Sequence, residues 1–379
     1  MSHVALVIPT LDRMGGAERQ AMLLARGLAA RGWRVTVVAL SGSGGAAAGE
    51  LAAAGVGFLT LEMRKGLADP RGWIRFHRWL RREAPDVVHA HLPHAAWLAR
   101  WSRAAAPMRV QLDTIHTSAT GTLGRRLGYR WSQWLPDRVT AVGQGVAEAW
   151  VNARMVRRER LLVVPNGVDV DAWRPDAEAS KAVRRELGVE DGFLWFAAGR
   201  FDPVKDYDTM LWALAQTPDR ARLAIAGAGP LEGEIRQLAA RLDLMTRVHF
   251  LGFQPDVRRW MRAADGFVQT SRWEGLPMGL LEAGACALPA VATDVAGTRE
   301  VVVDGETGWL APAGDRAALA AAMSALMQAS AQDREAMGER AREFVTERFS
   351  LGAVLDRWEA LYAELLEMNP MARRWAFRR

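Results

Sequence analysis

Two carboxylates flank a short turn that could bind a sugar and its phosphates. Residues 271–282 read S-R-W-E-G-L-P-M-G-L-L-E, with Glu274 in a predicted loop and Glu282 in the second turn of a predicted helix. Pro277 suits the first helical position, and Gly275 lets the backbone approach a ligand. A helix N-terminus favours an anion, and a carboxylate can accept hydrogen bonds from two neighbouring hydroxyls. The series fits a sugar, a diphosphate and a ribose, although solvated glutamates at a helix end have the same spacing.

Two cations follow another predicted strand. The apolar segment Phe193–Ala198 leads into Gly199, then Arg200 and, five residues later, Lys205. An arginine can hold a diphosphate through its forked guanidinium, and a lysine can hold it as a point charge. Charge alone does not separate this clamp from two solvated cations on a loop.

Further candidates follow predicted strands nearer the start of the chain. Gly15 and Gly16 close the loop after His3–Ile8, a continuously apolar segment that reads as a buried parallel strand. The loop lacks a full G-x-G-x-x-G, so it only weakly indicates a dinucleotide site, and a simple tight turn is the alternative. His116 stands at the exit of the predicted strand 109–115, where ligands of open α/β sheets bind.

A histidine pair raises the question of a metal. His89 and His91 form H-A-H at a strand end, but no third ligand with standard spacing stands nearby. Buried structural histidines are the alternative interpretation. No compelling D-x-D-type site is present either, so we expect the protein to work without a metal ion.

Composition bounds the class of protein. The chain has 379 residues, half of them hydrophobic, which favours two domains. Its one cysteine, Cys286, excludes an internal disulfide and a Cys-ligated structural zinc. The formal charge of +6 fits an anionic partner. No run approaches the roughly 20 apolar residues of a membrane span, and the apolar start is too short for a signal peptide, so we expect a cytoplasmic protein.

The elements that position these residues alternate between apolar strands and helices. The turn at 165–167, P-N-G, marks a boundary after which the strand, glycine loop and helix pattern restarts. Near the end, apolar residues at helical spacing predict one long amphipathic helix. They are Leu351, Val354, Leu355, Trp358, Leu361, Tyr362 and Leu365.

Six motifs, taken in order, resemble one family. They are G-G-A-E-R (15–19), D-T-I-H (113–116), P-N-G-V-D (165–169), G-R-x4-K-D (199–206), G-A-G-P (227–230) and E-x7-E (274–282). Together they resemble the retaining nucleotide-sugar glycosyltransferases of the GT-B fold, of the group-one or family-four type. This implies an α/β protein of two Rossmann-like domains facing across a cleft. The first would span 1–166 with a C-terminal helix, 350–379, packing back on it, and the second would span 167–349.

The resemblance also implies a role for each candidate residue. Arg200 and Lys205 would hold the donor diphosphate, and Glu282 would hold the ribose. Glu274 would contact a hydroxyl of the transferred sugar. The backbone N–H groups of Gly275 and Leu276 would lie near the sugar and phosphate, and Gly16 would approach the diphosphate. His116 would line the sugar site, and the backbone around Phe253 would lie near the base. Gly15 and Gly199 are the other implied donor-binding residues.

A reaction follows from the resemblance. Such an enzyme would transfer a hexose-type sugar from a UDP- or GDP-linked donor to a glycan or lipid-linked acceptor, in cell-surface polysaccharide or lipopolysaccharide assembly. Arg200, Lys205 and a helix N-terminus would stabilise the leaving diphosphate. The resemblance favours front-face transfer, while the sequence leaves double displacement open. The alternatives are a nucleotide-sugar epimerase of the same fold and a basic nucleic-acid-binding protein, although no nucleic-acid motif is found and no nucleic-acid partner is expected.

Three basic and aromatic stretches predict that the acceptor is presented by a membrane. They are 71–82, 121–134 and 373–379. Interleaved arginines and aromatic residues suit anionic head groups and the interfacial region of a bilayer. The alternative for 71–82 is a helix whose apolar side covers its own sheet. We therefore expect peripheral association with the inner face of the cytoplasmic membrane.

Overall fold

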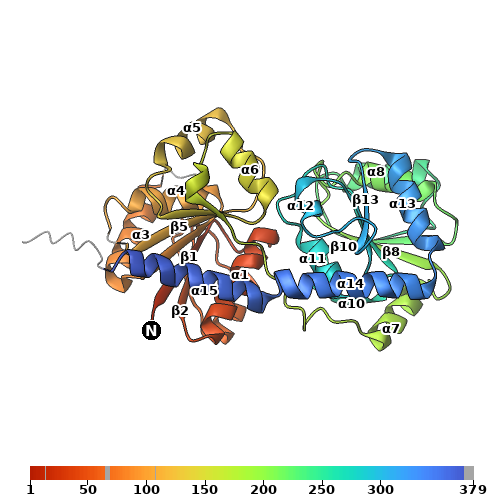
Figure 1. The fold of residues 1–379 in the computed structure, drawn as a ribbon, viewed down its shortest axis with the longest axis horizontal. Helices are drawn as coiled ribbons and strands as arrows, with labels where there is room; N and C mark the ends of the chain where they lie inside the picture. Colours follow the sequence, from red (N-terminus) through yellow and green to blue (C-terminus); the bar gives the residue numbers. More distant parts are fainter. Residues whose placement is uncertain (13, 65–68, 107, 371–379) are drawn as a thin grey trace, which may run out of the picture. The chain divides into compact units, whose positions relative to one another are not determined.

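The computed structural model describes residues 1–12, 14–64, 69–106 and 108–370, which form two compact units (Figure 1). Unit 1 comprises Met1–Gly167 together with the segment that begins at Leu351, and unit 2 comprises Val168–Ser350. The boundaries predicted from the sequence differ from this division by one residue.

Unit 1 is built on a seven-stranded parallel sheet with the order β3-β2-β1-β4-β5-β6-β7. Its strands are β1 (His3–Ile8), β2 (Arg34–Ala39), β3 (Gly57–Thr60), β4 (Val87–His91), β5 (Val110–Ile115), β6 (Arg138–Ala141) and β7 (Leu161–Val163). Its helices are α1 (Gly16–Ala30), α2 (Gly45–Ala53), α3 (Pro70–Glu83), α4 (Pro93–Ser102), α5 (Leu123–Ser132), α6 (Gln144–Asn152), the short 3-10 turn Arg158–Arg160 and α15 (Leu351–Met368). All six residues of β1 are buried, as expected for a central parallel strand covered on both faces.

Unit 2 repeats the same plan with six parallel strands in the order β10-β9-β8-β11-β12-β13. Its strands are β8 (Phe193–Ala198), β9 (Ala221–Ala226), β10 (Val248–Gly252), β11 (Gly266–Gln269), β12 (Ala290–Thr293) and β13 (Gly308–Ala311). Its helices are α7 (Ala177–Leu187), α8 (Tyr207–Ala215), α9 (Glu232–Arg241), α10 (Arg258–Ala263), α11 (Met278–Ala285), α12 (Ala296–Arg299), α13 (Arg316–Gln328) and α14 (Ala331–Phe349).

Each sheet contains one point at which the strand order reverses. In unit 1 this point lies between β1 and β4, and in unit 2 it lies between β8 and β11. Open α/β sheets bind ligands outside the carboxyl ends of the strands at such a switch point. The predicted class, α/β with two Rossmann-like units, is confirmed. The loops after β1, β8 and β11, which carry Gly15, Arg200 with Lys205, and Glu274, leave strands at these points. His116 follows β5 and Phe253 follows β10, which lie outside them.

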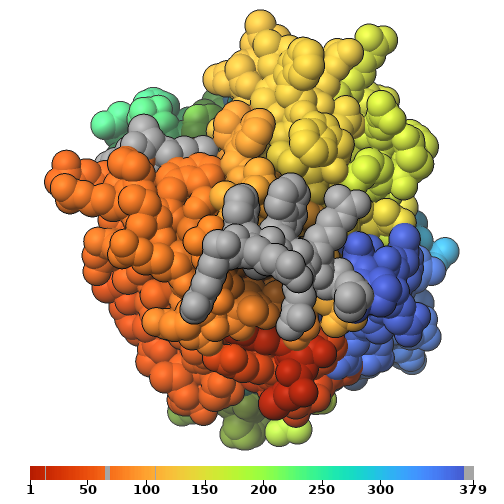
Figure 2. Space-filling model, turned by 90° about the vertical axis from the view of Figure 1, so that its left-hand side faces the viewer, coloured from red at the N-terminus to blue at the C-terminus, as the bar shows by residue number. Residues whose placement is uncertain are grey.

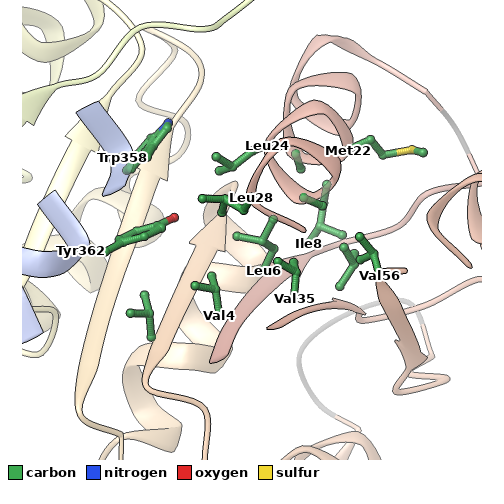
Figure 3. Close-up of a cluster of buried hydrophobic side chains, with 14 of the residues drawn as sticks. Val4, Leu6, Ile8, Met22, Leu24, Leu28, Val35, Val56, Trp358 and Tyr362 are labelled. Carbon is green, nitrogen blue, oxygen red and sulfur yellow. The ribbon is translucent and has the colours of Figure 1, made fainter. Parts of the chain in front are cut away.

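The helix α15 completes the core of unit 1, although it follows unit 2 in the sequence. Its buried face has the spacing of an amphipathic helix, and Trp358 and Tyr362 point from it toward the sheet and α1 (Figure 3). They meet a cluster that includes Leu6, Leu24 and Leu28, all at most 1 % exposed. The helix predicted to pack back on the first domain is therefore an integral part of that domain's core.

Candidate functional site

Lys205 and Glu274 contact each other at the β8–β11 switch point of unit 2. Nζ of Lys205 donates a hydrogen bond to Oε1 of Glu274 at 2.6 Å. The same oxygen accepts from Oγ of Ser271 at 2.6 Å and from Nε2 of Gln269, the last residue of β11, at 3.3 Å. Three donors thus fix the orientation of the carboxylate. Its other oxygen, Oε2, takes no part in these bonds and is available to accept from a ligand hydroxyl.

Arg200 and Lys205 lie on the loop between β8 and α8, and close backbone contacts shape this loop. The Tyr207 hydroxyl donates to the carbonyl oxygen of Gly199 at 2.9 Å. A side chain at Gly227 would overlap that same carbonyl, so the approach of the two loops requires glycine at 227. Arg200 is exposed, and within the described residues its guanidinium has no hydrogen-bond or ion-pair partner. One cation is therefore held by a carboxylate while the other faces solvent.

Glu282 is carried by α11, which follows directly on the turn of Gly275 and Leu276. Its side chain is only 6 % exposed, which is unusual for a glutamate. The predicted start of the helix at Pro277 is wrong by one residue, since α11 begins at Met278. Pro277 has φ −74° and ψ 111°, so its ring fits the backbone but its extended ψ makes it the residue before the helix.

Phe253 lies immediately beyond β10, and its ring is 66 % exposed. The end of β10 is joined to the next loop because the N–H of Gly227 donates to the carbonyl of Gly252 at 2.8 Å. The loops after β8, β9 and β10 are therefore linked by backbone contacts at one edge of the sheet.

A directed chain of hydrogen bonds crosses the buried part of unit 1. Oγ1 of Thr140 donates to the carbonyl of Asp113 at 3.2 Å, so it accepts from the Thr114 hydroxyl at 2.7 Å. Thr114 in turn accepts from Nε2–H of His89 at 2.6 Å, which leaves Nδ1 of His89 to accept from the Tyr362 hydroxyl at 2.7 Å. The chain ties α15 to three strands. Burial lowers the pKa of His89 well below its usual value, which is consistent with the neutral ring that this chain requires.

His116 is paired with His91 just beyond the strand ends of unit 1. Nδ1 of His91 and Nε2 of His116 lie 3.0 Å apart. Burial lowers the pKa of His116 to about 4, and burial together with the neighbouring histidines lowers that of His91 well below its usual value. Both rings are therefore neutral at pH 7, and one donates to the other. His116 is thus oriented by a fully buried partner.

Gly16 opens α1, and Gly15 precedes it, both exposed. The N–H of Gly15 donates to Oε2 of Glu18 at 3.0 Å, and burial raises the pKa of this glutamate. A side chain of the helix therefore already occupies part of the positive N-terminus, and an incoming anion would compete with it.

The H-A-H pair has no spare nitrogens at His89, since both of them are hydrogen-bonded. In the part of the chain that the structure describes, no group of three His, Cys, Asp or Glu side chains could hold a metal ion. Of the helices in that same part, none is long and apolar enough to cross a bilayer.

The structure brings Lys205 into contact with Glu274, and His116 into contact with His91. Gly15, Gly16 and His116 belong to unit 1, whereas the other candidate residues belong to unit 2. Sequence reasoning missed the two side chains that orient Glu274. Ser271 was detectable, because S-x-x-E is the spacing at which a serine and a glutamate meet across one turn. Gln269 carries no such signal.

Two family models match the chain. The model of glycosyl transferases group 1 matches residues 180–344, and that of glycosyltransferase family 4 matches residues 14–172. Among relatives, the phosphatidyl-myo-inositol mannosyltransferase of Mycobacterium leprae is 30 % identical over 353 residues, covering 86 % of this chain and 87 % of that protein. The UDP-Gal:alpha-D-GlcNAc-diphosphoundecaprenol alpha-1,3-galactosyltransferase of Escherichia coli is 24 % identical over 319 residues, covering 79 % and 81 %.

Solved structures share the fold. A crystal structure of Anabaena Alr3699/HepE in complex with UDP and glucose matches with a TM-score of 0.84 at 22 % identity, covering 95 % of this chain and 99 % of that chain. The sucrose-phosphate synthase of Thermosynechococcus elongatus matches with a TM-score of 0.83 at 21 % identity, covering 97 % and 100 %. With the family matches on both units and a relative aligned along most of its length, the chain belongs to the group 1 glycosyltransferases of the GT-B fold.

Proposed function

We propose that this glycosyltransferase moves a hexose-type sugar from a UDP- or GDP-linked donor to a glycan or lipid-linked acceptor with retention of anomeric configuration. The observation that carries the proposal is the contact between Lys205 and Glu274 at the switch point of unit 2. It sets a cation suited to a diphosphate beside a carboxylate suited to a sugar hydroxyl. The names of the M. leprae and E. coli relatives support an acceptor that is linked to a lipid.

Each side chain has a role that its position supports. Arg200 and Lys205 bind the diphosphate. Arg200 does so through its exposed guanidinium, and Lys205 exchanges its hydrogen bond to Glu274 for one to the phosphate. Glu282, in the buried second turn of α11, accepts from the ribose hydroxyls. Glu274 accepts from a hydroxyl of the sugar through Oε2.

Further donor-binding groups are proposed from both units. They are the backbone N–H groups of Gly275 and Leu276, the backbone of Gly199 and Phe253, and, from unit 1, Gly15, Gly16 and His116.

The charges at this site suit breakage of the anomeric C–O bond. The electron pair of that bond stays on the diphosphate oxygen, and Arg200 and Lys205 stabilise the charge without a metal ion. In front-face transfer the acceptor hydroxyl forms the new bond on the side that the diphosphate leaves, and its proton goes to the leaving phosphate oxygen. We favour this route because no carboxylate has been assigned as a nucleophile for double displacement. The product class would serve cell-surface polysaccharide or lipopolysaccharide assembly.

Calorimetry with UDP, GDP and their sugars tests the donor. One nucleoside diphosphate should bind. Glu282→Ala should abolish most of this binding because Glu282 contacts the ribose, whereas Glu274→Ala should retain it because Glu274 contacts the sugar. Glu234→Ala, an exposed glutamate of the same unit, is the matched control. Loss of nucleotide binding in Glu274→Ala with normal binding in Glu282→Ala would contradict the assignment.

Product analysis tests the reaction. NMR of the product formed with the preferred donor and a lipid-linked acceptor should show the anomeric configuration of the donor, with chelator present throughout. Inversion, or a requirement for a divalent ion, would overturn the corresponding part of the proposal. An epimerised donor formed without any acceptor would favour the epimerase instead.

A further inference from the structure

The helix α5 presents an apolar stripe that the described residues of its own unit leave exposed. Leu123, Leu127 and Trp131 recur at every fourth position and are 69 %, 45 % and 75 % exposed, and Trp134 just beyond the helix is 67 % exposed. Single exposed apolar side chains are ordinary, but three large ones on one ten-residue helix, with a fourth just beyond its end, form a patch of the kind that marks an interaction surface. The yellow residues at the top of Figure 2 belong to this region of unit 1.

The opposite side of α5 is firmly seated, so the stripe cannot turn inward. Tyr129 and Ser132 are buried, and Nη1 of Arg100 donates to Oγ of Ser132 at 2.8 Å while its guanidinium carbon lies 4.3 Å from the centroid of the Tyr129 ring. At Gly128 a side chain would overlap the ring of Trp97 on α4. The inner side of α5 is therefore closely packed against unit 1, and the orientation of its outer face is fixed.

The charged residues of α5 and of the segments next to it in the sequence are all arginines. Arg126 and Arg130 are exposed and border the apolar stripe, and Arg125 is partly exposed. Residues 114–136 contain no aspartate or glutamate. A helix with an apolar stripe, flanking arginines and tryptophans at the boundary suits the interfacial plane of an anionic bilayer, where tryptophan rings sit at head-group level.

The helix α3, which spans the whole stretch 71–82, lacks this property. Phe76, Trp79 and Leu80 are at most 7 % exposed, so most of its large apolar side chains are buried in unit 1, as the alternative interpretation held for Phe76 and Leu80. Ile74 is its one large apolar residue among the exposed ones, at 49 %. The stretch 373–379 lies outside the described residues. Of the two stretches that the structure describes, only the one on α5 presents its apolar side outward.

We propose that the outer face of α5, together with Trp134, docks this enzyme reversibly on an anionic bilayer. The strand β5 ends at Ile115, His116 follows, and residues 117–122 lead directly into α5. This short connection is itself held, because Nε1 of Trp150 donates to the carbonyl of Thr117 at 2.8 Å. A docked α5 would therefore be joined to His116 only through residues 117–122. That this serves a lipid-linked acceptor rests on the proposed function, whereas docking itself does not.

Vesicle co-sedimentation of the full chain tests the proposal. The wild type should bind mixed phosphatidylcholine–phosphatidylglycerol vesicles and dissociate from them when salt is added. It should not bind vesicles of pure phosphatidylcholine. The variant Leu127→Ser/Trp131→Ser/Trp134→Ser should lower the bound fraction at least tenfold. A matched control on α3, Ile74→Ser with Arg78→Gln, changes an exposed apolar residue and an exposed arginine of the same unit and should bind like the wild type.

Several results would overturn the proposal. They are equal sedimentation of the α5 variant and the wild type, loss of binding in the α3 control instead, and no wild-type binding to anionic vesicles. Sedimentation velocity without lipid adds another, since self-association that the α5 variant abolishes would identify the face as a contact between copies of the chain. Nucleotide calorimetry on the α5 variant separates the two proposals, because donor binding in unit 2 should be unchanged when docking is lost.

Discussion

Lowering the pH should destabilise unit 1 more than unit 2. Six of the seven histidines lie in unit 1, and His89, His91 and His116 are packed together there. Their pKa values are lowered by burial. As the pH falls, these histidines therefore bind protons in the unfolded chain before they do so in the folded unit. The stability that these neutral rings confer is complete above about pH 6.5. It is lost as the pH falls below that value, because the unfolded state then binds more protons.

The size of the effect can be worked out for His116. Its pKa falls from 6.5 to about 4, and each pH unit in that window is worth about 1.4 kcal/mol. At pH 5 this histidine alone should have removed about 2 kcal/mol, a large part of the 5–15 kcal/mol typical of a domain. His89 and His91 add to it with the same sign. The raised pKa of Asp113, due to its burial, acts in the opposite direction, but it is one carboxyl against three histidines.

Hydrogen exchange measured by mass spectrometry at pH about 7 and about 5 distinguishes the units, with each amide corrected for its intrinsic rate. Protection of β4 and β5 should fall at the lower pH, while that of β8 and β9 should change little. His116→Gln should reduce the pH dependence of the unfolding free energy of unit 1 by the equivalent of one bound proton. His249 is the only histidine of unit 2, and His249→Gln should leave this pH dependence of unit 1 unchanged. Equal loss in both units, or a slope that His116→Gln does not alter, would refute the reasoning.

Four further substitutions test the proposed roles and contacts. Arg200→Ala or Lys205→Ala should lower turnover at least about a hundredfold, as loss of one charge-stabilising donor does, and steady-state kinetics with near-normal rates would contradict the clamp. Ser271→Ala should lower kcat about tenfold to a hundredfold, because a hydrogen bond to a charged group is worth about 1.5–3 kcal/mol, while calorimetry should show unchanged nucleotide affinity. Tyr362→Phe should leave His89 without its donor and cost about 1–3 kcal/mol, visible as a lower midpoint of thermal unfolding for unit 1 alone.

Much of the fold could be predicted because parallel strands carry a strong local signal. β1 and β8 are continuous apolar runs, and both are buried in the centre of a sheet. Helix ends were less accurate, as Pro277 shows. Its fixed φ is compatible with both the first helical position and the residue before it, and only ψ, which depends on the packing of the turn, decides between them.

The site was predictable where residue type and strand end coincide, and not where a contact joins distant segments. Lys205 and Glu274 were each found from a local motif, but their mutual bond depends on the sheet that sets β8 beside β11. The hydrogen bond from Tyr362 to His89 spans 273 residues, and no local spacing signals it. The two basic stretches on helices were alike in sequence. Only the packing of α3 and α5 shows which apolar face is covered.

The position of α15 in the sequence has a consequence for biosynthesis. Unit 2 is a continuous segment, Val168–Ser350, and can fold as soon as it leaves the ribosome. Unit 1 emerges first but lacks the helix whose Trp358 and Tyr362 fill its core until Met368 has been added. Unit 1 is therefore synthesised first but can complete its core only after unit 2 has been translated. Throughout translation of the second unit, the nascent first unit exposes an apolar surface that chaperones would recognise.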